Sequence, residues 1–141
     1  MAPKPKHTLP PCGYLVVYLG LQPEVLVALQ AEARSEAKSS GYVPVVKEVG
    51  CEHDDAFCEQ ARVKKAAGAI RELKIALKRI TTCLDPQWLP SVLSFMRSRP
   101  GGEEQESHHD YPKEVIAVAK KGNRLPASIV LALERGPGAC P

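Results

Sequence analysis

Hydrophobic residues recur at steps of three and four between Arg62 and Leu84. They are Val63, Ala66, Ile70, Leu73, Leu77, Ile80 and Leu84. This spacing places the apolar side chains on one face of a helix. The stretch therefore predicts a long amphipathic helix of about 22 residues and roughly 33 Å.

The segment before this helix predicts a strand, a helix and a second strand. Residues 14–19 are nearly all apolar and rich in β-branched and aromatic types, which is typical of a strand buried on both faces. Pro23 fits the first position of a helix over 23–38, because a proline there lacks only an N–H that would be unpaired anyway. Residues 42–49 alternate in polarity, and Pro44 removes one ladder donor, which favours an edge strand.

The remaining patterns are shorter. They predict a helix over 87–98, a strand over 114–119 and a strand over 127–134, the last with a helix as the alternative. The resulting order, β-α-β-α-α-β-β, favours a parallel first pair of strands and a hairpin at the end. We expect an α/β fold in which the long basic helix and the shorter helix pack on a small mixed sheet of about four strands.

The chain of 141 residues is the length of one domain. Four prolines and two lysines among residues 1–11 predict a flexible tail. We expect a single α/β domain over 12–135, with a mobile acidic loop at 98–112. Residues 136–141 predict a C-terminal tail.

The positive charge of the chain is concentrated in the predicted long helix. The formal net charge is only +3, but seven basic residues and one acid lie between positions 62 and 79. The basic residues are Arg62, Lys64, Lys65, Arg71, Lys74, Lys78 and Arg79. A cationic ridge of this kind could follow a phosphate backbone without reading its sequence, so nucleic acid is the leading candidate partner.

Other interpretations of the basic helix remain open. Its charged side could be a solvated face, partly neutralised by the acidic loop. Ile75 lies among the charges, which favours a protein partner or an oligomer interface instead. Aromatic residues make up only 5% of the chain, so there is little to stack on bases.

Cys51, His53 and Cys58 form one of two clusters with metal-ligand character; the other is His108, His109 and Asp110 in the acidic loop, which could also be a solvent loop without chemistry. The spacing of the first cluster, C-x-H-x4-C, departs from the two close pairs typical of structural zinc sites, so its residues are weak metal candidates.

Asp54 or Asp55 would cap the start of the basic helix, which places Cys58 in its first turn. The helix dipole would lower the pKa of the Cys58 thiol there, and His53 could act as its base. Alternatively, Cys58 has no chemical role and is buried as a small hydrophobic residue.

Motifs of the common enzyme classes are missing from the sequence. It contains no glycine-rich phosphate loop, no nucleophile elbow and no HExxH. We therefore expect a non-enzymatic binding protein without a cofactor. An odd number of cysteines and the lack of a leader or of about 20 consecutive apolar residues favour a cytoplasmic location without membrane insertion, or a nuclear one in a eukaryote.

Overall fold

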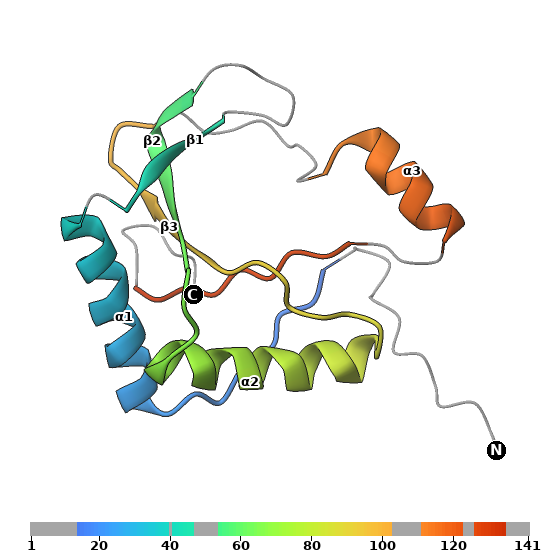
Figure 1. The fold of residues 1–141 in the computed structure, drawn as a ribbon, viewed down its shortest axis with the longest axis horizontal. Coiled ribbons are helices and arrows are strands. Elements are labelled where there is room, and N and C mark those ends of the chain that lie inside the picture. The colour runs from blue at the N-terminus through green and yellow to red at the C-terminus, as the bar shows by residue number, and fades with distance from the viewer. Residues whose placement is uncertain (1–13, 40, 47–53, 103–110, 123–125, 135–141) are drawn as a thin grey trace. The chain divides into compact units, whose positions relative to one another are not determined.

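The computed structural model describes residues 14–39, 41–46, 54–102, 111–122 and 126–134. These residues form three helices and three strands (Figure 1). In chain order the elements are α1 (Pro23–Lys38), β1 (Val43–Val46), β2 (Asp54–Arg62), α2 (Gly68–Leu84), β3 (Ser94–Ser98) and α3 (Lys113–Lys121). The protein is thus a mixed α/β structure, as the pattern predicted. None of the helices in these ranges is both long and apolar enough to cross a bilayer.

The chain divides into two compact units. One consists of Met1–Glu32 and Val63–Leu93, and the other of Ala33–Arg62 and Ser94–Pro141. The predicted tails lie outside the described residues, and the single domain over 12–135 stays a prediction.

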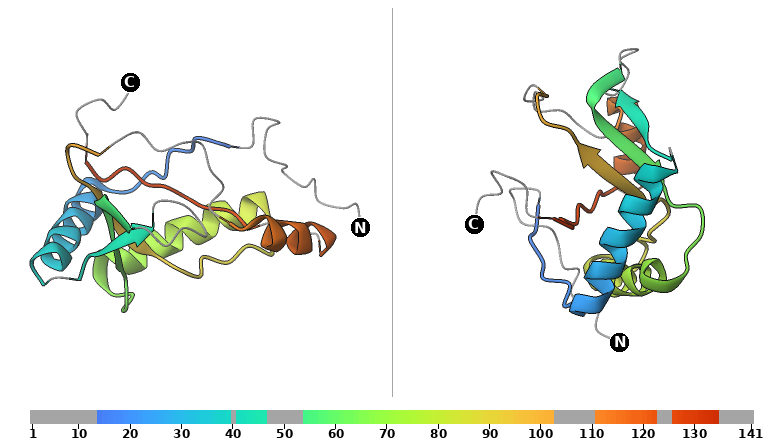
Figure 2. Two further views of the ribbon diagram at one scale, coloured as in Figure 1. Left: turned by 90° about the horizontal axis from the view of Figure 1, so that it is seen from above. Right: turned by 90° about the vertical axis from the view of Figure 1, so that its left-hand side faces the viewer.

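The sheet differs from the expected one in both size and direction. Its order is β1-β2-β3, and both pairs are antiparallel, so the prediction of a mixed sheet with about four strands was wrong for the described residues. A parallel pair was inferred from a helix standing between two predicted strands. The first of these, residues 14–19, runs as extended chain outside the sheet (Figure 2). Val16 and Tyr18 are 86% and 91% exposed there, so burial on both faces was also wrong.

Long-range pairing explains why the central segment was misread. Residues 54–62 pair with β1 on one side and β3 on the other, so their backbone groups find partners far along the chain. Val63 continues this pattern by donating its N–H to the Leu93 carbonyl at 2.9 Å. The helix therefore begins at Gly68, well after the predicted start, with a left-handed φ of 49° at that glycine.

Helix α1 confirms the prediction for residues 23–38. Pro23 is its first residue, Glu24 lies in the first turn and Lys38 in the last, where each charge suits the helix dipole. By contrast, residues 113–121 form a helix where a strand was predicted over 114–119. Glu114 and the two terminal lysines complement the helix dipole at its two ends, which outweighs the β-branched side chains between them.

The C-terminal half holds two further corrections. Residues 87–93 have no regular structure, and 94–98 form β3, so the helix predicted over 87–98 was wrong. Residues 127–134 run as extended chain and form neither the predicted strand nor the alternative helix (Figure 2).

Each unit has its own buried residues. In the first unit they are Leu29 from α1 and the inner stripe of α2, which comprises Ala69, Ile70, Leu73, Leu77 and Thr81. In the second unit they are Ala61 and Phe95, which are directly opposite each other on β2 and β3, together with Asp55. The α2 stripe keeps the predicted three-and-four spacing and fixes which side of that helix faces solvent.

Candidate nucleic-acid interface

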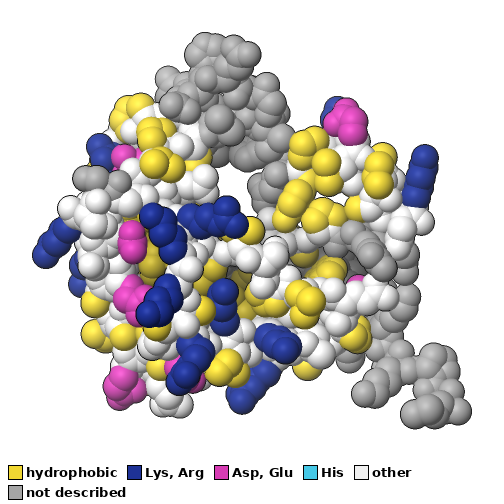
Figure 3. All heavy atoms as spheres, viewed as in Figure 1, with side chains coloured by type: hydrophobic (Ala, Val, Ile, Leu, Met, Phe, Trp, Pro, Cys, Tyr) yellow, Lys and Arg dark blue, Asp and Glu magenta, His cyan; other side chains and the backbone are white. Residues whose placement is uncertain are grey.

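The outer side of α2 carries a row of cations. Arg71, Ile75 and Lys78 follow one another at steps of four and three, and all three are exposed. Arg79 lies beside this row, and Lys74 is half-buried at its margin. Figure 3 shows Lys and Arg side chains along α2 with apolar side chains between them. The amphipathic character of the segment is therefore retained, with charge opposite the buried stripe.

The structure gathers only part of the predicted basic set on this helix. Arg71, Lys74, Lys78 and Arg79 lie on α2, whereas Lys64 and Lys65 are exposed in the connection that precedes it. Arg62 ends β2 and belongs to the second unit. The prediction of a continuous helical ridge of seven cations was thus wrong, because residues 62–67 are not helical.

The row of cations on α2 is shorter than the predicted ridge and can contact fewer phosphates. From Arg71 to Arg79 the helix rises about 12 Å, against the roughly 33 Å expected for the whole segment. One strand of a DNA duplex presents a phosphate about every 3.4 Å along its axis, so α2 spans three or four phosphates.

The cations on α2 are not neutralised by other described residues. No carboxylate in the described ranges lies within 4.0 Å of Arg71, Lys74, Lys78 or Arg79; the ion pairs there join Arg34 to Glu134 and Glu59 to two arginines. The acidic residues of 103–110 lie outside the described part of the chain, so neutralisation by that segment stays untested.

Cys58 occupies a different environment from the one expected. It lies in the middle of β2, so the argument for a helix dipole lowering its pKa was wrong. Partial burial raises the pKa of the Cys58 thiol, the charges of Asp55 and Glu59 raise it further, and a hydrogen bond with Ser98 opposes them. Such a thiol is a poor nucleophile at neutral pH.

The candidate metal ligands are not brought together by the described residues. Cys51 and His53 lie outside them, and no group of three His, Cys, Asp or Glu suited to a metal occurs within them. The weak metal prediction therefore has no geometric support among the described residues.

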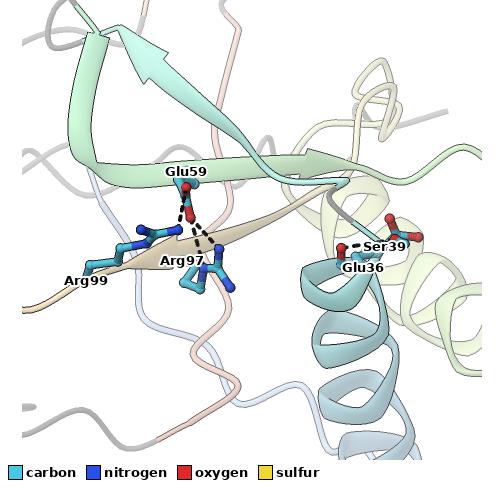
Figure 4. A network of polar contacts seen from close by, with 5 residues as sticks. All are labelled: Glu36, Ser39, Glu59, Arg97 and Arg99. Atoms are coloured by element: carbon cyan, nitrogen blue, oxygen red, sulfur yellow. Dashed lines mark hydrogen bonds and ion pairs between the residues drawn. The ribbon is translucent and has the colours of Figure 1, made fainter.

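A charged cluster that the sequence analysis missed lies on one face of the sheet (Figure 4). Glu59 of β2 accepts a hydrogen bond from Arg97 Nε at 3.0 Å and one from Arg99 Nη2 at 2.8 Å. The Arg97 guanidinium also lies over the Tyr42 ring, 4.5 Å from its centroid. The hydrogen bonds from Arg97 are the main reason why the pKa of Glu59 falls below its usual value.

The signal for this cluster was the alternation Arg97-Ser98-Arg99, which has the period of a strand. This alternation was not recognised as a strand because the residues were assigned to the end of the helix predicted over 87–98 and to the loop after it. The partner, Glu59, is 38 residues from Arg97 along the chain and had been placed in the long helix.

Comparison of the chain with protein-family models, with curated proteins and with solved structures finds no match.

Proposed function

We propose that the protein is a non-enzymatic binding protein whose anionic partner is a nucleic acid. The outer face of α2 contacts the phosphates of that partner. The observation that carries this proposal is the set of four cations on one helix without a carboxylate partner among the described residues. Lys64 and Lys65, exposed in the connection before α2, extend the same unit's positive surface.

This surface suits phosphate contacts more than base reading. Lysine and arginine on an exposed helix side form ion pairs that release counterions from the nucleic acid. No aromatic side chain lies among them on α2 to stack on bases. We therefore expect weak binding with little sequence preference, and a strong dependence on salt.

Titration of labelled duplex DNA and RNA at several salt concentrations tests the proposal. Four phosphate contacts predict a slope of log K against log salt of about −3.6 on duplex DNA. The triple variant Lys64→Glu, Arg71→Glu, Lys78→Glu removes two of these contacts and introduces repulsion, so binding at low salt should fall well over tenfold.

A matched control keeps the change in net charge the same. Lys113→Glu, Lys120→Glu, Lys121→Glu reverses three exposed lysines of α3, in the other unit. This control should retain the salt slope of the wild type. Equal losses in both triple variants would mean that total charge matters rather than α2, and no binding at low salt would end the proposal.

Ile75 supports a second candidate function. It is 42% exposed in the middle of the charged row, where a phosphate-binding face has no use for an apolar side chain. A protein partner, including a second copy of the chain, would cover it. Sedimentation over a range of concentrations should then show association that Ile75→Ser weakens, and a monomer throughout would exclude self-association.

A further inference from the structure

The outer edge of β3 carries backbone groups without a strand partner among the described residues. Arg99 donates its N–H to the Phe57 carbonyl at 2.7 Å, and Val63 donates its N–H to the Leu93 carbonyl at 2.9 Å, so both positions have the phase of hydrogen-bonded pairs. In an antiparallel ladder such pairs alternate, so Arg97 with Glu59 and Phe95 with Ala61 are hydrogen-bonded as well. Ser94, Met96 and Ser98 therefore direct their N–H and C=O groups away from β2.

The two edges of the sheet are not equivalent. β1 contains Pro44, which has no N–H, and its register with β2 shifts between Pro44 and Val45. Both features obstruct the addition of another strand. The pairing of β3 with β2 is regular over five consecutive residues, and within the described ranges β3 ends the sheet. The β3 edge is thus the one suited to receive a further strand.

The side chains of β3 define what that strand should contain. On one face, Met96 is 64% exposed and lies between the two serines. On the opposite face, two arginines share the single carboxylate of Glu59, which leaves one net positive charge. The Arg99 side chain is 53% exposed and gives Glu59 one of its five N–H donors. An acidic side chain would complete this cluster.

We propose that the β3 edge binds an extended acidic peptide as an added antiparallel strand. Main-chain hydrogen bonds to Ser94, Met96 and Ser98 supply the affinity, and alternate side chains supply the specificity. Acidic residues lie opposite Arg99 and Arg97, and an apolar residue lies opposite Met96. Written from its N-terminus, the peptide therefore reads acid, any residue, acid, apolar residue. This site consists of residues of the second unit, whereas the α2 surface belongs to the first.

A fluorescein-labelled decapeptide with the central sequence Glu-Thr-Glu-Val-Thr tests the proposal by fluorescence anisotropy with the full chain. In the proposed register the N–H of its valine points at the Met96 carbonyl, whereas the N–H of the preceding glutamate points away. N-methylation of the valine should weaken binding about tenfold or more, because one hydrogen bond is lost and a bulky group enters the edge. N-methylation of that glutamate should have little effect.

Protein variants test the charge and the edge separately. Arg99→Glu should weaken binding at least tenfold, whereas Lys113→Glu, an equal charge change on α3, should not. Met96→Pro should abolish binding, since the N–H that it removes points away from β2. If that variant does not fold, the two N-methylated peptides decide the question with the wild-type protein.

Two outcomes would overturn the proposal. Equal affinities for the two N-methylated peptides would mean that charge alone attracts the peptide and that no strand is added. Self-association lost in Met96→Pro and unaffected by the peptide would assign the edge to a second copy of the chain. The triple α2 variant used for nucleic acid should bind the peptide as the wild type does, which keeps this test independent of the proposed function.

Discussion

Two isoleucines on α2 give the sharpest test of the structure. Ile70 is 1% exposed and Ile75 is 42% exposed, although they are five residues apart on the same helix. Replacing each by alanine deletes the same atoms and changes helix propensity by the same few tenths of a kcal/mol. Any difference in the free energy of unfolding between the two variants therefore reports burial alone.

The expected magnitudes follow from these exposures. Ile→Ala removes three carbon groups, each contributing about 0.8 kcal/mol when fully buried. At Ile70 this amounts to roughly 2.4 kcal/mol, and the cavity left behind brings the loss into the range of about 2–5 kcal/mol. At Ile75 only part of the side chain is shielded and water fills the gap, so the loss should be about 1 kcal/mol or less.

Urea unfolding followed by fluorescence is the assay. Trp88 is the single tryptophan of the chain and lies in the same unit as α2, so its emission reports the unfolding of that unit. Ile70→Ala should lower the unfolding midpoint markedly, and Ile75→Ala slightly. If Ile70→Ala does not fold, Ile70→Val should still cost about 0.5–1.5 kcal/mol.

Equal losses at the two positions would refute the reasoning. They would mean that the helix presents a different side to the core of its unit, and that the charged row described above is not the solvent-facing one. A larger loss at Ile75 would have the same meaning and would withdraw the α2 face as a binding surface.

Two further predictions concern the second unit. The pKa of Glu59 is lowered in the folded state, so its contribution to stability is present above the unfolded pKa of about 4.3 and is lost as the pH falls through the lower folded value. Glu59→Gln should therefore flatten the loss of thermal stability between pH 5 and pH 3, and a pH profile identical to that of the wild type would contradict the arginine cluster. The raised pKa of Cys58 predicts that, in single-cysteine variants at pH 7.5, Cys58 reacts with a disulfide reagent more slowly than the exposed Cys83. Faster modification of Cys58 would show that the thiol is more open or more acidic than the structure describes.

Local signals were sufficient for α1 and for the inner face of α2, but not for α3, whose residues were predicted as a strand. Helix α1 follows from the proline and the acid in its first turn, and the inner stripe of α2 from its three-and-four spacing. The charged side of α2 could be predicted for the same reason, because the periodicity that buries Ile70 and Leu73 exposes Arg71 and Lys78.

Strands could not be located in this way, because their hydrogen bonds are made with distant residues. Residues 54–62 are polar and gave no strand signal, yet they occupy the middle of the sheet, where both neighbours pair with them. Residues 14–19 have the composition of a buried strand and remain outside the sheet.

The sequence by itself determined the faces of α1 and α2 and the charge that they carry, since helix periodicity is a local property of the chain. Only the tertiary structure decided the strand register, and with it the meeting of Glu59, Arg97 and Arg99 and the edge of β3 that has no strand partner among the described residues. The reason is that a cross-strand contact depends on which residues are paired, and a shift of one residue would move these side chains to the opposite face.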